Sequence, residues 1–156
     1  MAHQRRKRAN ISQKMREAIH WRDNWRCFYC GHDMSQWAQH KYRGTLIQID
    51  HLIPFIKGGP DEFWNYVTAC RMCNIQKKGH SLEEFREIRK RQLIRLVNLY
   101  LEHKDLLEYT RCKGDYLNQL AYSIISQGQT TLIAETAFKF KFYGEAVRQI
   151  ATKSTL

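Results

Sequence analysis

Long apolar segments are missing from this sequence of 156 residues. No apolar run approaches the ~18 residues that a bilayer-spanning helix needs, so we do not expect a membrane protein. The N-terminus is basic, but no apolar stretch follows it, which argues against a secretory signal. We find no internal repeat and no low-complexity segment. A hydrophobic fraction of 43% with 12% aromatic residues is enough for a core, so the chain is not expected to be disordered.

Acidic side chains are scarce. Only 15 Asp and Glu stand against 26 Lys and Arg, which gives a net charge of +11 and favours a polyanionic partner. The excess lies mainly in residues 1–26, where eight basic residues stand against two acidic ones. A basic tail can also serve solubility alone, but this distribution favours nucleic acid. The basic residues expected to touch DNA in this arm are Arg5, Arg6, Lys7 and Arg8.

The hydrophobic pattern predicts short elements of both kinds, and therefore an α+β chain. Residues 1–9 are expected to form a basic arm, residues 10–80 a compact core, and residues 81–156 a helical C-terminal region. The expected helices cover about residues 12–23, 71–78, 81–108 and 115–126, and the expected strands cover residues 46–53 and 66–68. Asn10 or Ser12 is expected to cap the first helix, and Ser81 with Glu84 is expected to form a capping box at the start of the long one.

Four of the five cysteines form two CxxC pairs, Cys27 with Cys30 and Cys70 with Cys73. Paired spacing of this kind favours a metal over disulfides and a reducing, cytoplasmic setting. Thiolates prefer tetrahedral zinc at about 2.3 Å, and a small unit with few core residues needs such a link. We therefore expect a structural zinc. The alternatives are four unrelated thiols or an iron–sulfur site, although nothing nearby indicates electron transfer.

Between and after these pairs, Asp50-His51, Asn65 and Asn74 complete a longer pattern. The segment Asp-His-Leu-Ile-Pro, then Gly-Gly, Asn-Tyr-Val and Cys-Arg-Met-Cys-Asn resembles the HNH endonucleases, members of the ββα-metal (His-Me finger) group. The resemblance covers about residues 15–85. It implies a small zinc-bound ββα-metal nuclease core with an N-terminal helix and a helical C-terminal part. The third letter of the family name is Asn74 here, which still offers an oxygen ligand.

The residues themselves suit phosphodiester hydrolysis. Asp50 and Asn74 offer hard oxygen ligands for Mg²⁺ or Mn²⁺, and His51 is the candidate general base, because histidine is the residue type whose ordinary pKa suits that role. By resemblance, Asn65 bridges backbone groups of the loop between the strands and holds His51 in place. Taken singly, an Asp-His pair is usually a surface pair and an Asn usually caps a turn. Their joint spacing within a cysteine cage favours function.

The sequence therefore predicts a Mg-dependent HNH endonuclease that hydrolyses DNA, with Arg71, Lys77 and Lys78 near the flanking phosphates. Two alternatives stay open. One is a zinc-containing DNA-binding or assembly module without catalysis. The other is a nuclease effector subunit of a multi-component defence or mobile-element system. The C-terminal helices could serve a homodimer or a protein partner.

Overall fold

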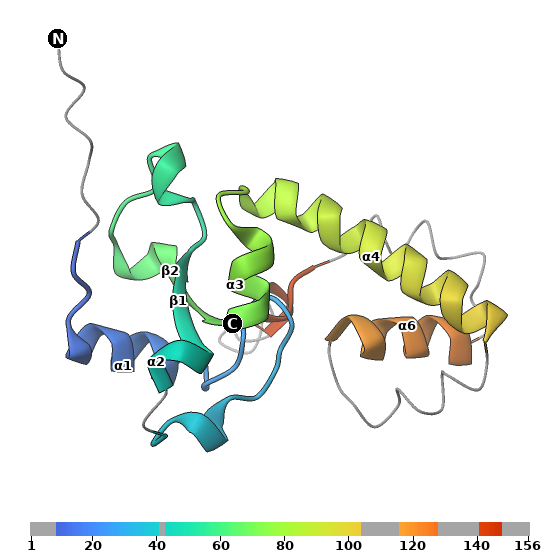
Figure 1. Cartoon of the computed structure of the whole chain (residues 1–156), viewed down its shortest axis with the longest axis horizontal. Coiled ribbons are helices and arrows are strands. Elements are labelled where there is room, and N and C mark those ends of the chain that lie inside the picture. The colour runs from blue at the N-terminus through green and yellow to red at the C-terminus, as the bar shows by residue number, and fades with distance from the viewer. Residues whose placement is uncertain (1–8, 41–42, 104–115, 128–140, 148–156) are drawn as a thin grey trace, which may run out of the picture.

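The computed structural model describes residues 9–40, 43–103, 116–127 and 141–147. Figure 1 shows the first helices and both strands gathered at one end of the molecule, while α4 and α6 extend at the other end. The main elements in chain order are α1 (Gln13–Arg22), α2 (Arg43–Leu46), β1 (Ile47–His51), β2 (Tyr66–Cys70), α3 (Arg71–Lys77), α4 (Leu82–Glu102) and α6 (Tyr116–Ser126).

The two strands form an antiparallel sheet that leads directly into α3. Their register pairs Ile47 with Cys70 at one end and His51 with Tyr66 at the other. Short single-turn 3-10 helices over Phe55–Lys57 and Phe63–Asn65 lie in the loop between the strands. The α+β class and the strand–strand–helix order expected from the sequence are confirmed.

Helix α1 is capped by a polar side chain at its N-terminus and is attached to the sheet at its C-terminus. Ser12 caps its N-terminus, because the hydroxyl accepts a hydrogen bond from the backbone of Met15. Asp23 follows the last turn, and its carboxylate accepts a hydrogen bond of 2.7 Å from the backbone N–H of Thr68 in β2. Ile19 and His20 form the buried face of this helix.

Helix α4 begins with the capping box that the sequence predicts, in which Ser81 and Glu84 satisfy each other's backbone N–H groups. It ends at Glu102, earlier than the expected residue 108, and the following residues 104–115 lie outside the described part. Helix α6 packs against it. The hydroxyl of Tyr100 donates a hydrogen bond of 2.7 Å to Asn118 across this interface.

The segment 141–147 returns to the first cysteine pair. Phe142 is fully buried and stacks on Phe85, with 5.5 Å between ring centroids. It also meets Tyr29 edge to face at 5.2 Å. The backbone N–H of Gly144 donates to the carbonyl of Phe28 at 2.8 Å, and a Cβ on Gly144 would come within 2.1 Å of the Phe28 ring. Glycine is therefore required for this close approach.

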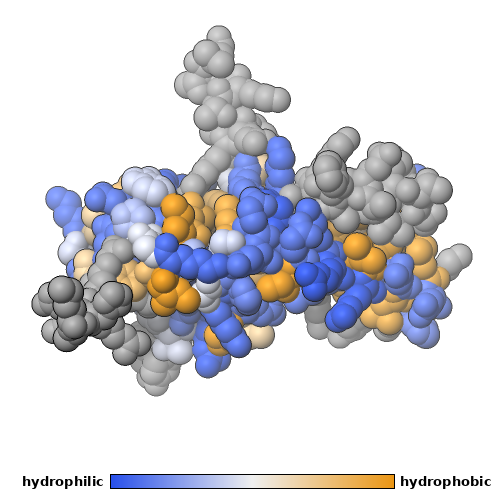
Figure 2. Space-filling model, turned by 90° about the horizontal axis from the view of Figure 1, so that it is seen from above, coloured by the Kyte–Doolittle hydropathy of each residue, from blue (hydrophilic) through white to orange (hydrophobic). Residues whose placement is uncertain are grey.

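The buried apolar side chains form one cluster, which extends from Cys27 and Tyr29 through Phe85 to Leu117 in α6. Hydrophilic side chains make a broad band across the face shown in Figure 2, and hydrophobic patches interrupt it. Among the helices that the structure describes, none combines the length and the apolarity needed to cross a membrane.

Candidate active site

The two cysteine pairs meet at the junction of β2 and α3. Cys27 and Cys30 lie in a tight turn that Gly31 closes with a φ of 70°, a left-handed conformation that favours glycine. Cys70 ends β2 and caps α3, and its sulfur accepts a hydrogen bond of 3.4 Å from the backbone of Cys73. The fold therefore brings together two pairs that are separated by about 40 residues.

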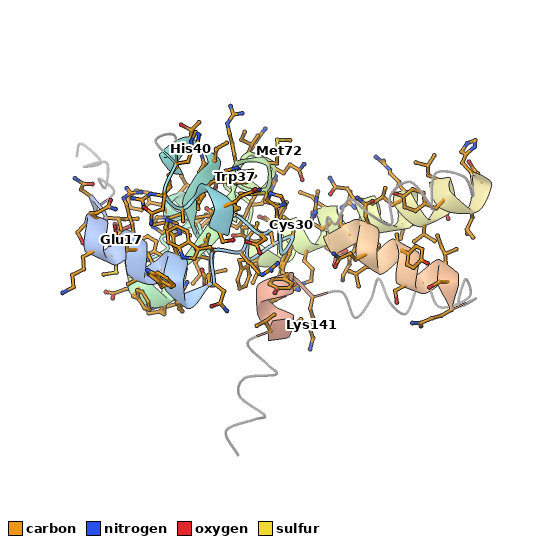
Figure 3. The ribbon with its side chains drawn as sticks, turned by 90° about the horizontal axis from the view of Figure 1, so that it is seen from below. Glu17, Cys30, Trp37, His40, Met72 and Lys141 are labelled. Carbon is orange, nitrogen blue, oxygen red and sulfur yellow. The ribbon has the colours of Figure 1, made fainter. Side chains whose placement is uncertain are left out.

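The four sulfurs have the arrangement that a tetrahedral metal needs. They all lie within 4.8 Å of one another, and the sulfurs of Cys30 and Cys70 are 3.9 Å apart. Four ligands at about 2.3 Å from one ion are separated by about 3.8 Å, so the cluster is compatible with zinc. Hydrogen bonding with Cys27 and burial raise the pKa of the Cys30 and Cys73 thiols, so a cation is needed to hold them as thiolates. Trp37 and Met72 lie beside Cys30 (Figure 3).

Asp50 and His51 are the last two residues of β1. Neighbouring strand residues normally point to opposite faces, but the strand ends at His51 and both residues border one open pocket of about 430 Å³. The same pocket is lined by Asn74 and Lys78 from the opposite side and by Arg16 from α1. The expected catalytic residues thus converge, apart from Asn65.

The Asp50 carboxylate is 8% exposed and is held by three donors. Its Oδ2 accepts from the hydroxyl of Tyr29 at 2.7 Å and from the ammonium of Lys77 at 3.0 Å. Its Oδ1 accepts from the backbone N–H of His51 at 2.8 Å. Burial raises the pKa of Tyr29, so this hydroxyl remains a donor. Since a carboxylate has about four acceptor sites, Oδ1 keeps one lone pair for a cation.

Asp61 holds the ring of His51. Nε2 of His51 lies 2.8 Å from Oδ1 of Asp61, which also accepts from the hydroxyl of Tyr66 at 3.0 Å. The backbone N–H of Ala9 donates to the other oxygen at 3.0 Å. The hydrogen bond from His51 lowers the pKa of Asp61 to about 2, so this carboxylate is ionised and can only accept. In the neutral imidazole, Nε2 therefore carries the hydrogen.

The other ring nitrogen of His51, Nδ1, has no hydrogen-bond partner among residues 9–40, 43–103, 116–127 and 141–147. The ring itself is fixed by packing against Tyr66, with 4.8 Å between ring centroids. A neutral imidazole held in this way presents an unprotonated Nδ1, which is the state required of a general base.

Asn65 is fully buried and bridges the loop that follows β1. Its carbonyl oxygen accepts from the backbone of Ile53 at 2.8 Å, and its amide donates to the carbonyls of Ile53 and Pro60 at 3.1 and 2.9 Å. Gly59 lies so close that a Cβ there would come within 1.8 Å of the Ile53 carbonyl oxygen. These contacts close the loop that carries Asp61 and are those expected of a bridging asparagine.

The side-chain amide of Asn74 is hydrogen-bonded through its nitrogen, and its oxygen remains available. The nitrogen donates to the side-chain oxygen of Gln48 on β1 at 2.5 Å. No described residue donates to the Asn74 oxygen, so it can serve as a neutral hard ligand beside Asp50.

Three basic residues expected near phosphates have different surroundings. Lys77 is fully buried, and its ammonium donates to the His51 carbonyl at 2.7 Å as well as to Asp50. Lys77 is therefore directed into the protein, whereas the sequence led us to expect it near phosphates. Its burial follows from helical geometry, because Lys77 lies one turn after the buried Cys73 on the same face of α3. Lys78 borders the pocket and Arg71 is exposed. The arm residues Arg5, Arg6, Lys7 and Arg8 lie outside the described part.

Residues 27–89 match the protein-family model described as HNH endonuclease. This segment is an HNH endonuclease domain. The match contains both cysteine pairs, Asp50, His51 and both asparagines, so the resemblance inferred from the sequence is confirmed. No curated protein and no solved structure shows a significant match to the chain.

Sequence reasoning missed three supporting residues of this HNH domain: Tyr29, Gln48 and Asp61. Tyr29 lies between the first two cysteines, where a buried aromatic residue with a hydroxyl signals a polar partner. Asp61 follows the Gly-Gly-Pro turn, and Gln48 alternates with Asp50 along β1. Only the closure of the loop between the strands brings Asp61 to His51.

We expect one zinc per chain, and replacing Cys30 by Ser should release it and unfold the HNH domain. Zinc binding to such sites is worth about 10–16 kcal/mol, which is as large as the total stability of most domains. Elemental analysis and circular dichroism measure both effects. Cys112→Ser is the matched control, because this cysteine lies outside both pairs, and it should retain the metal. A folded parent protein without zinc would contradict the assignment.

Proposed function

We propose that this chain is a metal-dependent endonuclease that hydrolyses DNA phosphodiester bonds, with His51 as the general base. The observation that carries the proposal is the His51–Asp61 pair in a pocket that also contains the Asp50 carboxylate and the Asn74 amide. The match to HNH endonucleases supports the same class of reaction.

The chemistry begins at Nδ1 of His51, the ring nitrogen that carries a lone pair while Nε2 donates to Asp61. This lone pair takes a proton from a water molecule as the water oxygen bonds to phosphorus. The bond between phosphorus and the 3′ oxygen then breaks, and the leaving oxygen takes up a proton from solvent. The negative charge of Asp61 stabilises the imidazolium that forms.

Asp50 and Asn74 would hold the catalytic cation, because each offers an oxygen with a lone pair that no hydrogen bond to a described residue uses. When bound, Mg²⁺ or Mn²⁺ neutralises a non-bridging phosphate oxygen and the departing alkoxide. Lys77 already balances the charge of Asp50, so we expect weak affinity for free Mg²⁺ and completion of the ligand shell by substrate. Asp50→Ala should then be more harmful than Asn74→Ala.

The choice of DNA as substrate rests on charge. The net charge of +11 favours a polyanion, and Lys78 and Arg16 contribute positive charge at the rim of the pocket. Arg71 is exposed at the start of α3 and extends this basic character. Four reduced cysteines in one cluster accord with action in the cytoplasm, where thiols stay reduced.

His51→Ala should reduce the rate of plasmid nicking by roughly 10²–10⁴-fold, because a general base contributes about this much. Zinc content and DNA affinity should stay close to those of the parent, since the ring contributes little to phosphate binding. His103→Ala is the matched control, an exposed histidine at the end of α4 that should leave nicking unchanged. A His51 variant with more than a tenth of the parental rate would place the base elsewhere.

Asp61→Asn should lower kcat by at least roughly 10²-fold with little change in KM. An amide that donates to Nε2 leaves the hydrogen on Nδ1, where it blocks proton uptake. Nitrogen NMR of the His51 imidazole measures the tautomer directly, and we expect the hydrogen on Nε2 in the parent and on Nδ1 in the variant. Glu62→Gln removes the same charge from the next, exposed residue and should retain activity. Unchanged kcat and tautomer in Asp61→Asn would contradict the role of Asp61.

A further inference from the structure

A second open pocket, of about 480 Å³, adjoins the candidate active site. It lies between α1 and the chain that leads into β1, and its lining includes Glu17 and His20 on one side and His40 and Arg43 on the other. Figure 3 shows Glu17 and His40 at the same end of the molecule. Arg16 lines both this pocket and the pocket of Asp50 and His51, so the two pockets are neighbours at this residue.

Among the described residues, each of the two arginines of the second pocket is anchored through one of its nitrogens. Nε of Arg16 donates to the backbone carbonyl of Ile11 at 3.1 Å, and one terminal nitrogen of Arg43 donates to the carbonyl of Ala38 at 3.0 Å. Neither forms an ion pair with a carboxylate of the described residues. A guanidinium has five N–H donors, so each side chain is fixed in place and still presents a fork of donors.

Three other arginines differ from this pair, because each of them lies against an acid. Arg22 lies 2.8 Å from Asp23, Arg26 lies 2.7 Å from Asp33, and Arg86 lies 2.7 Å from Glu145. Those contacts neutralise the cation and occupy its fork. Arg16 and Arg43 keep their charge available for an external anion.

The charges of both arginines converge on the buried His20. Burial, and then the positive charges of Arg43 and Arg16, lower the pKa of His20 to about 4, while Nδ1 of the ring lies 3.0 Å from the hydroxyl of Thr68. His20 is therefore neutral at neutral pH. Two acids oppose them at His20: Asp23, which pairs with Arg22 and does not line the pocket, and Glu17, which lines the pocket and accepts a hydrogen bond from Gln13 at 2.6 Å. Two fixed cations thus outweigh one carboxylate in this pocket.

We infer that Arg16 and Arg43 bind backbone phosphates of the nucleic-acid strand beside the phosphodiester to be cleaved. This inference rests on the proposed function and adds the path of the substrate to it. Planar guanidinium forks match phosphate oxygens, and contacts of this kind fix the register of a strand without reading its sequence. Because Arg16 borders both pockets, a strand crossing Asp50 and His51 continues toward Arg43.

The test is binding of a fluorescently labelled DNA duplex to the zinc-loaded full chain, measured by anisotropy without added Mg²⁺ across a range of salt. Arg16→Gln and Arg43→Gln should each weaken binding by roughly 3–10-fold and lower the slope of log Kd against log salt by about 1. Arg43→Lys keeps the charge but loses the fork, and should fall between parent and Arg43→Gln. Glu17→Gln should tighten binding. Inorganic phosphate at millimolar concentration should not displace the duplex.

Arg95→Gln is the matched control, since Arg95 is an exposed residue of α4 that lines neither pocket and its replacement removes the same charge. It should change Kd by less than about twofold. Equal losses in Arg95→Gln and Arg43→Gln would overturn the inference in favour of diffuse charge, and displacement of the duplex by free phosphate at constant ionic strength would overturn it in favour of a site for a small anion. Unaltered zinc content and circular dichroism establish that each variant is folded.

The same measurements separate this inference from the proposed nuclease. If the parent nicks plasmid with Mg²⁺ but replacing Arg16 or Arg43 does not change the Kd for DNA, the second pocket is not part of the substrate path and only the inference fails. If the parent cuts no DNA while its binding depends on both arginines, the nuclease proposal fails and the phosphate-binding pocket stands.

Discussion

The convergence of four cysteine sulfurs at the junction of β2 and α3 determines where the remaining site residues lie. Cys70 and Cys73 belong to the strand–strand–helix unit, whereas Cys27 and Cys30 belong to the turn that carries Tyr29. Joining the pairs places Tyr29 against Asp50. Without a cation, four thiols at this spacing, three of them buried, offer little attraction, so a metal bound by the cysteines would hold the geometry of the site.

A buried polar network connects the cysteine cluster to Asp50 and His51. Lys77 is fully buried, which would be very unfavourable for an unpaired ammonium. It is compensated by the Asp50 carboxylate and the His51 carbonyl, and Tyr29 completes the set. Phe142 packs on the ring of Tyr29, so a residue far along the chain supports the position of Asp50. Removing the Asp50 carboxylate would leave the buried Lys77 ammonium without its counter-charge and the Tyr29 hydroxyl without this acceptor.

Local sequence signals were sufficient for much of the fold. The Ser12 cap, the Ser81–Glu84 capping box and the two CxxC pairs each depend on residues close in the chain, and the structure has all of them. The pairing of Asp61 with His51 could not be derived in this way, because it depends on how the loop between the strands closes. The return of Phe142 to Tyr29 is likewise a long-range contact. The burial of Lys77 could have been predicted from the sequence, since Lys77 follows Cys73 by four residues and so lies on the same face of the helix.

The metal response of DNA cleavage tests the account most directly. Supercoiled plasmid is incubated with the zinc-loaded full chain and Mg²⁺, EDTA is added, and nicking and bound zinc are followed together. The account predicts that nicking stops while the zinc is still bound, and that excess Mg²⁺ or Mn²⁺ restores it whereas added Zn²⁺ does not. Full nicking in EDTA, or recovery with Zn²⁺ alone, would contradict the division between a structural zinc at the cysteines and a catalytic cation at Asp50 and Asn74.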